Sequence, residues 1–199
     1  MSLVAYSLTT RQNLKDVLGI TANDTTTNNL LDNIINRATD IIEKYCNGRR
    51  FASTAYTNQE YDGTGTKYID LKHWPVTALT AYDRNDGDFS TTNWNTLNVE
   101  NIKLIDDGDG PGQVFYSFGF ARGVRNYRFT YTAGYSTIPN DIEEACLQLA
   151  SYIYNDKKNK GMKSESLGEY SYTKESLVGN VIDNLGIDLI LEPYRVPNV

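Results

Sequence analysis

The hydrophobic residues of this chain change their spacing twice, and this change is the strongest constraint on the fold. Apolar residues recur every three or four positions from about Thr27 to Cys46, which predicts an amphipathic helix with one buried face. Beyond Phe51 the spacing becomes alternating, as in strands with one buried face, and after Pro139 it is helical again. Helical regions on both sides of a β region predict an α+β fold in which the first and last parts of the chain pack together.

Four stretches carry helical signals. The first stretch has a threonine as its N-cap and a glycine at its end. A proline begins the third stretch, and Gly186 weakens the helical tendency of the last. The stretches run from Thr9 or Thr10 to Gly19, from about Thr27 to Cys46, from Pro139 to the lysines that begin at Lys157, and from Val181 to Leu191. We expect about four helices, packed as a bundle by residues 1–55 and 137–199.

Residues 56–136 alternate between apolar and polar side chains in several short stretches. The clearest stretch places Tyr127, Phe129 and Tyr131 on one face of a strand. Residues 62–65 have the composition of a hairpin turn between strands at 59–61 and 68–71. Further strands are expected at 76–82, near 102–105, at 114–120 and at 127–132. Together they predict an antiparallel β-sandwich or barrel-like insertion between the second and third main helices.

Composition narrows the functions open to such a fold. With 40% hydrophobic and 22% charged residues, the 199-residue chain has an ordinary globular composition. Nineteen Lys and Arg against 25 Asp and Glu give a net charge of -6, which argues against free nucleic acid as the main partner. Fifteen tyrosines suit sheet faces and protein interfaces, where the ring is buried and the hydroxyl stays hydrogen-bonded.

The sequence contains no motif of an enzyme, a metal site or a membrane protein. Its apolar runs fall short of the ~20 residues of a membrane span, and its first residues lack a signal-peptide pattern, so we expect a soluble protein made in a cytoplasm. A single histidine, His73, excludes a multi-histidine metal site, and Cys46 and Cys146 are interpreted as buried core residues. We therefore expect no catalysis, no cofactor, no metal and no membrane partner.

Two basic groups each allow two interpretations. Residues 118–121 match part of an aromatic RNA-binding strand signature whose flanking positions are missing, so an ordinary strand is favoured. The arginines after them fit solvent-facing strand positions or contact with a polyanion: Arg122, Arg125 and Arg128. The lysines at the end of the third helix fit stabilisation of its carbonyl end or contact with DNA or an acidic neighbour: Lys157, Lys158, Lys160 and Lys163.

An ordered series of short motifs spans most of the chain. The first half holds Leu8-Thr9-Thr10, Leu18-Gly19-Ile20, the apolar stripe of residues 30–45, and residues 61–65 leading to Trp74-Pro75-Val76. The second half holds residues 131–135, residues 138–142 and residues 164–172. In this order the motifs resemble the tailed-phage head-to-tail connector family, whose members are also called adaptor or head-completion proteins. Residues 83–126 depart from the pattern and look like an enlarged β insertion.

The resemblance implies a structural protein of the virion, placed at the head-tail junction after assembly in the host cytoplasm. Such proteins form a homo-oligomeric ring, commonly a dodecamer, beneath the portal protein. The ring extends the DNA channel and provides the attachment platform for the stopper or tail-completion protein. An acidic chain suits such a conduit, because a wall that bound the genomic DNA tightly would retard its passage.

The resemblance also implies which parts make contacts. The helices would form the ring body, and the C-terminal segment from about Ile187 would dock on the portal, with Ile187, Leu191, Tyr194 and Arg195 as candidates. Simple packing on the bundle explains Leu189 to Leu191 equally well. Candidates for subunit or partner contacts are Tyr170 and Tyr172, together with Lys157, Lys158, Lys160 and Lys163.

The sequence also allows two functions of other classes. A host- or glycan-binding β module of a virion would use the exposed aromatic residues of the sheet. A nucleic-acid-binding protein would use the lysine cluster.

Overall fold

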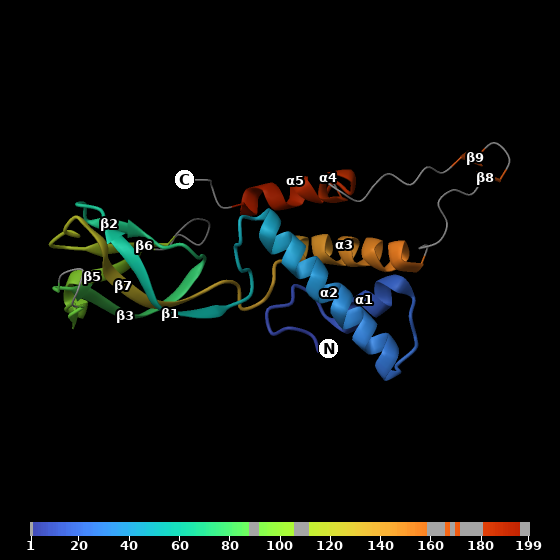
Figure 1. The fold of residues 1–199 in the computed structure, drawn as a ribbon, viewed down its shortest axis with the longest axis horizontal. Coiled ribbons are helices and arrows are strands. Elements are labelled where there is room, and N and C mark those ends of the chain that lie inside the picture. The colour runs from blue at the N-terminus through green and yellow to red at the C-terminus, as the bar shows by residue number, and fades with distance from the viewer. Residues whose placement is uncertain are drawn as a thin grey trace. The chain divides into compact units, whose positions relative to one another are not determined.

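The computed structural model describes residues 2–87, 92–105, 112–158, 166–167, 170–171 and 181–195 (Figure 1). The chain divides into two compact units, one made of residues 1–49 and 138–199 and the other of residues 50–137. The first is helical and the second is built of strands, so the predicted α+β class is confirmed.

The helical unit begins with two helices whose ends are fixed by their capping residues. α1 spans Arg11–Leu18, with Thr10 Oγ1 accepting a hydrogen bond from the backbone N–H of Asn13 at 3.2 Å. It ends at Gly19, whose φ of 65° is a left-handed conformation that glycine adopts without strain. α2 spans Thr25–Tyr45 and starts at Asp24, whose carboxylate accepts from the N–H of Thr27 at 2.9 Å. This cap explains why α2 begins two residues before the predicted Thr27.

α3 spans Asn140–Lys158 and packs against both α1 and α2 (Figure 1). The side chains that face one another between these helices are fully or almost fully buried: Leu14, Leu31, Ile35, Ala38, Ile42, Ile142, Ala145, Cys146 and Leu149. The spacing of three and four that predicted the helices therefore marks their buried faces. The last elements of this unit are β8 (Ser166–Leu167), β9 (Tyr170–Ser171), α4 (Val181–Asn184), α5 (Ile187–Leu191) and the 3-10 turn η2 (Glu192–Tyr194).

The β unit consists of two antiparallel sheets. The larger has the order β1-β7-β3-β4, formed by β1 (Thr54–Gly63), β7 (Gly123–Ala133), β3 (Val76–Asn85) and β4 (Trp94–Thr96). The smaller has the order β2-β6-β5, formed by β2 (Tyr68–Asp70), β6 (Gln113–Tyr116) and β5 (Ile102–Ile105), with the 3-10 turn η1 (Val99–Asn101) before β5. The described strands do not close into a barrel, so the insertion is an open two-sheet structure.

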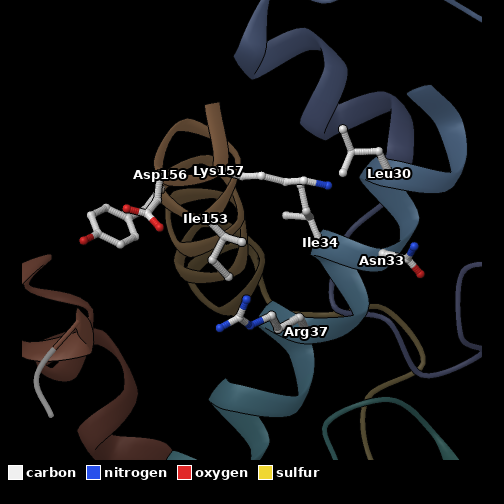
Figure 2. A pocket seen from close by; sticks show the side chains of 8 residues that line it. Leu30, Asn33, Ile34, Arg37, Ile153, Asp156 and Lys157 are labelled. Atoms are coloured by element: carbon white, nitrogen blue, oxygen red, sulfur yellow. The ribbon is translucent and has the colours of Figure 1, made fainter. Parts of the chain in front are cut away.

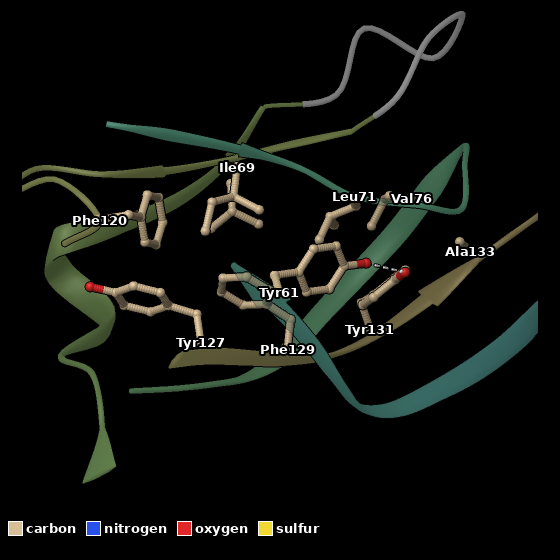
Figure 3. Close-up of a cluster of buried hydrophobic side chains, with 10 residues drawn as sticks. Tyr61, Ile69, Leu71, Val76, Phe120, Tyr127, Phe129, Tyr131 and Ala133 are labelled. Carbon is tan, nitrogen blue, oxygen red and sulfur yellow. Dashed lines mark hydrogen bonds between the residues drawn. The ribbon is translucent and has the colours of Figure 1, made fainter. Parts of the chain in front are cut away.

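The core of this unit is aromatic and centres on β7. Tyr127, Phe129 and Tyr131 are each at most 1% exposed, which confirms the alternation predicted for this strand (Figure 3). The hydroxyls of Tyr61 and Tyr131 are hydrogen-bonded at 2.7 Å, and the ring of Phe120 meets that of Tyr127 edge-on at 4.9 Å. The buried tyrosines thus keep their polar ends satisfied while their rings fill the core.

The predicted hairpin between β1 and β2 is wrong. β1 pairs with β7, whereas β2 pairs with β6 in the other sheet, so the turn at residues 64–67 carries the chain from one sheet to the other. Its backbone is held by a segment distant in sequence: Gly65 N–H donates to the Phe120 carbonyl at 2.8 Å and Phe120 N–H donates to the Thr66 carbonyl at 2.7 Å. The turn composition was read correctly, but the strand partners depend on contacts more than fifty residues away.

The strand predicted at residues 114–120 ends at Tyr116. A turn follows, in which the N–H of Gly119 donates to the carbonyl of Tyr116 at 3.0 Å and Gly119 adopts a φ of 81°. The start of the unit also differs from the sequence-based limit at residue 56. Residues 51–53 already join it, because the N–H of Tyr135 donates to the carbonyl of Phe51 at 2.7 Å and that of Ser53 to the carbonyl of Tyr135 at 3.0 Å.

Candidate functional site

The C-terminal segment of the helical unit holds the four residues predicted to dock on another protein. α4 and α5 are separated by Gly186, which has a φ of 68°, and α5 contacts α3. The side chains of Ile187 and Leu191 are fully buried in this unit, so in the described conformation they fix α5 in place and present no surface. Leu189, between them, is 78% exposed.

Tyr194 is held in the helical unit by contacts with Arg49 and Asp141. Arg49, itself only 3% exposed, donates from Nη1 to the Tyr194 carbonyl at 3.0 Å, and its guanidinium carbon lies 5.6 Å from the centre of the tyrosine ring. The Tyr194 hydroxyl donates to Oδ2 of Asp141 at 2.6 Å. These contacts tie the last described residues to the end of α2 and the start of α3.

Arg195 makes contacts within the helical unit but remains partly exposed. Its guanidinium lies 5.1 Å from the ring centre of Tyr45 and pairs with Glu192 at 3.2 Å. The side chain is 37% exposed, so an outside partner can still reach it. Of the four docking candidates, Tyr194 and Arg195 are therefore the two with some surface to offer, and their role as contacts stays a prediction.

A groove between α2 and α3 lies on the same unit. It encloses about 280 Å³ and is lined by Leu30, Asn33, Ile34, Arg37, Tyr152, Ile153, Asp156 and Lys157 (Figure 2). Arg37 and Lys157 are exposed cations at its rim, whereas Ile34 is buried in its floor. The helical spacing of Leu30, Ile34 and Arg37 puts them on one face, but the sequence could not show that α3 leaves a hollow beside them.

The basic and tyrosine-rich positions predicted beyond this groove are described only in part. Lys157 and Lys158 are the last two residues of α3, and their role as contacts stays a prediction. Tyr170 lies in β9, which pairs with β8. Lys160, Lys163 and Tyr172 lie outside the described residues.

The β unit carries a second, more polar hollow of about 350 Å³. Arg122, Arg125 and Trp94 are among its lining residues, together with Glu60. Arg128 is engaged within the unit, because it pairs with Asp83 at 2.7 Å and lies over the Trp94 ring at 4.5 Å. The structure thus brings Arg122 and Arg125 together in one hollow with the carboxylate of Glu60, and contact with a polyanion stays a prediction.

The two cysteines and the single histidine are occupied in packing. Burial raises the pKa of both cysteine thiols to about 12, so neither Cys46 nor Cys146 forms a reactive thiolate near neutral pH. The His73 ring stacks on that of Tyr56 at 3.9 Å, and burial together with Lys72 and Arg50 lowers its pKa. No group of three metal-ligating side chains is found in the described part of the chain. None of its helices is long and apolar enough to cross a membrane.

A family model described as "Head completion protein" matches residues 7–196, so the chain belongs to the head completion protein family. This is a family of structural proteins and not of enzymes, and it confirms the resemblance drawn from the ordered motifs. No curated protein matches the chain.

Three solved structures have a similar fold over the whole chain. The neck of an empty gene transfer agent (GTA) particle, computed with C6 symmetry, gives a TM-score of 0.64 at 13% identity, covering 100% of this chain and 96% of that chain. The virion of a native gene transfer agent particle gives 0.58 at 14% identity, covering 100% and 95%. The neck of the native particle, computed with C12 symmetry, gives 0.56 at 15% identity, covering 100% and 96%. At these identities the likeness concerns the fold.

Proposed function

We propose that this protein is a head-to-tail connector that forms a ring beneath the portal of a phage-like particle. The observation that carries the proposal is the match to the head completion protein family over residues 7–196. Two of the solved structures of similar fold are particle necks computed with sixfold and twelvefold symmetry, which supports a ring and, among ring sizes, a dodecamer.

The helical unit is assigned to the ring body, and the ring extends the channel through which genomic DNA passes. The net charge of -6 supports a passage without specific binding, because an acidic wall does not gather phosphates. A strongly basic lumen in a solved ring would contradict this assignment. The partners are further copies of the chain, the portal protein on one side and a stopper or tail-completion protein on the other, at the head-tail junction of a virion assembled in the host cytoplasm.

Docking on the portal is assigned to the end of the C-terminal segment. Ile187 and Leu191 hold α5 on the helical unit from inside, while Tyr194 and Arg195 stand where the segment leaves η2. Subunit or partner contacts are assigned to Lys157, Lys158, Lys160 and Lys163, and to Tyr170 and Tyr172.

Electron microscopy of the purified protein, alone and mixed with the portal of the same particle, tests the proposal. Rings, or a layer added to the portal, are expected. A protein that remains monomeric and adds nothing to the portal would overturn it. Deletion of Pro193 to Val199, which removes Tyr194 and Arg195, then tests the docking assignment. We expect loss of portal attachment while circular dichroism shows that the protomer remains folded, and full attachment of the shortened chain would contradict the assignment.

A further inference from the structure

The α2–α3 groove has the size of a site for one protruding side chain. Its volume of about 280 Å³ lies at the lower limit of the ~300–1,000 Å³ of small-molecule pockets. The floor and one wall are apolar, formed by Leu30, Ile34 and Ile153, and in Figure 2 the Lys157 side chain reaches from α3 towards α2. The charged residues that line the groove are two cations, Arg37 and Lys157, and one carboxylate, Asp156, so their sum is positive. An apolar floor with this rim is suited to an apolar side chain that has acidic neighbours.

The same unit presents such a side chain on α5. Leu189 is 78% exposed, more than any other large hydrophobic residue in the described part of the chain. Asp188 precedes it and Glu192, which is 65% exposed, lies three residues further along. The burial of Ile187 and Leu191 fixes the helix from which Leu189 projects, so the exposed leucine is held by a rigid support.

We propose that Leu189 of one copy of the chain inserts into the α2–α3 groove of a second copy. The leucine is removed from water against Leu30, Ile34 and Ile153, and the acidic flank of α5 meets the cations of the rim. Since the two surfaces are different patches of one protomer, the contact is head-to-tail, and its repetition closes a ring when the rotation between copies allows it. This inference rests on the proposed ring and names one contact within it.

The first test compares two exposed apolar residues of the helical unit, Leu189 and Val17. Leu189→Ser should raise the concentration needed for ring assembly at least tenfold, because a side chain buried at an interface centre is lost. Val17→Ser is the matched control, since Val17 is 58% exposed on α1 and outside the groove, and it should assemble like the wild type. Mass photometry over a dilution series measures both. Equal assembly of Leu189→Ser and wild type would overturn the proposal.

A disulfide test identifies the second copy and the direction of the contact. Leu189→Cys combined with Asn33→Cys places one thiol on α5 and one in the groove, and both positions are exposed in the protomer. The native Cys46 and Cys146 are buried with raised pKa values and do not compete under mild oxidation. A head-to-tail contact gives a ladder of cross-linked chains that extends beyond dimers on a denaturing gel.

The other outcomes of this test count against the proposal. Dimers alone would mean a two-fold contact, and monomers alone would mean that the groove is filled from within the chain or by another protein. Assembly of the wild-type protein distinguishes failure of the Leu189 contact from failure of the proposed function. If wild-type rings form and neither the serine variant nor the cysteine pair behaves as expected, the inference alone is overturned; if the wild type assembles neither alone nor on the portal, the proposed function fails.

Discussion

The cores of the two units of this protein are stabilised by different interactions. Among the described residues, six buried polar or charged residues lie in the helical unit, namely Thr9, Lys15, Asp32, Thr39, Glu43 and Arg49, against Asp83 in the β unit. In the helical unit these groups join segments far apart in sequence: Thr9 donates to Glu143 at 2.8 Å, and Asp32 receives two hydrogen bonds from Arg11, each at 2.7 Å. The β unit is held instead by a stack of aromatic rings along β7.

The difference teaches where each unit is vulnerable. A ring-filled core depends on volume, so truncating one ring leaves a cavity that the neighbours fill only in part. A network of buried polar contacts depends on pairing, so removing one partner releases a specific segment. Because the two tryptophans, Trp74 and Trp94, both lie in the β unit, their fluorescence follows that unit, while circular dichroism at helical wavelengths follows the other.

The largest effect is expected from Phe129→Ala in the β unit. Phe129 is fully buried, with its ring centre 5.4 Å from that of Tyr61 and 6.2 Å from that of Phe120. The substitution should lower the free energy of unfolding by about 3–5 kcal/mol, measured by tryptophan fluorescence in urea. Phe118→Ala is the control, since Phe118 is 75% exposed and its loss should change stability by less than about 0.5 kcal/mol. Equal effects of the two substitutions would show that the stability of the β unit does not depend on its buried rings.

A smaller and more local effect is expected from Arg49→Met in the helical unit. The substitution removes the charged hydrogen bond to the Tyr194 carbonyl and should cost about 2 kcal/mol. Hydrogen exchange should accelerate in α5 and η2 and remain unchanged in the β unit. Lys44→Met is the control, because Lys44 is exposed in the last turn of α2, five residues before Arg49. Uniform acceleration over the whole helical unit would show that Arg49 supports the bundle rather than the C-terminal segment.

The next effect, about 1 kcal/mol, is expected from Tyr194→Phe. The change removes only the hydroxyl that donates to Asp141, and Asp141 is exposed, so its carboxylate regains water. Hydrogen exchange of α5 is again the measurement. Tyr154→Phe serves as the control, on a half-buried tyrosine of the same unit. A loss as large as that of Arg49→Met would mean that the Asp141 contact, and not the buried arginine, anchors the segment.

These contacts also mark what the sequence could and could not predict. Thr10 and Gly19 are local signals, and they placed α1 correctly, while the alternation of Tyr127, Phe129 and Tyr131 identified the buried face of β7. Strand pairing is not local, and the interpretation of residues 62–65 as a hairpin failed for that reason. Arg49 follows the end of α2 and has no sequence pattern that reveals its burial. The α2–α3 groove could not be predicted, because its lining depends on how α2 and α3 pack against each other.

The smallest effect is expected from protonation of His73, the single histidine of the chain, which lies in the β unit. Burial, with Lys72 and Arg50 nearby, lowers the pKa of His73, and its ring stacks on Tyr56. In the unfolded chain His73 is therefore protonated near pH ~6.5, whereas in the folded unit it is protonated only at a lower pH. The stability contributed by the neutral imidazole is present above pH ~6.5 and is lost as the pH falls through the pKa of the folded state. NMR titration of the one imidazole signal should give a pKa below that of free histidine. His73→Phe keeps a ring against Tyr56. In this variant the urea midpoint of unfolding, followed by tryptophan fluorescence, should depend less on pH. An unchanged pH dependence would assign the acid sensitivity to carboxylates.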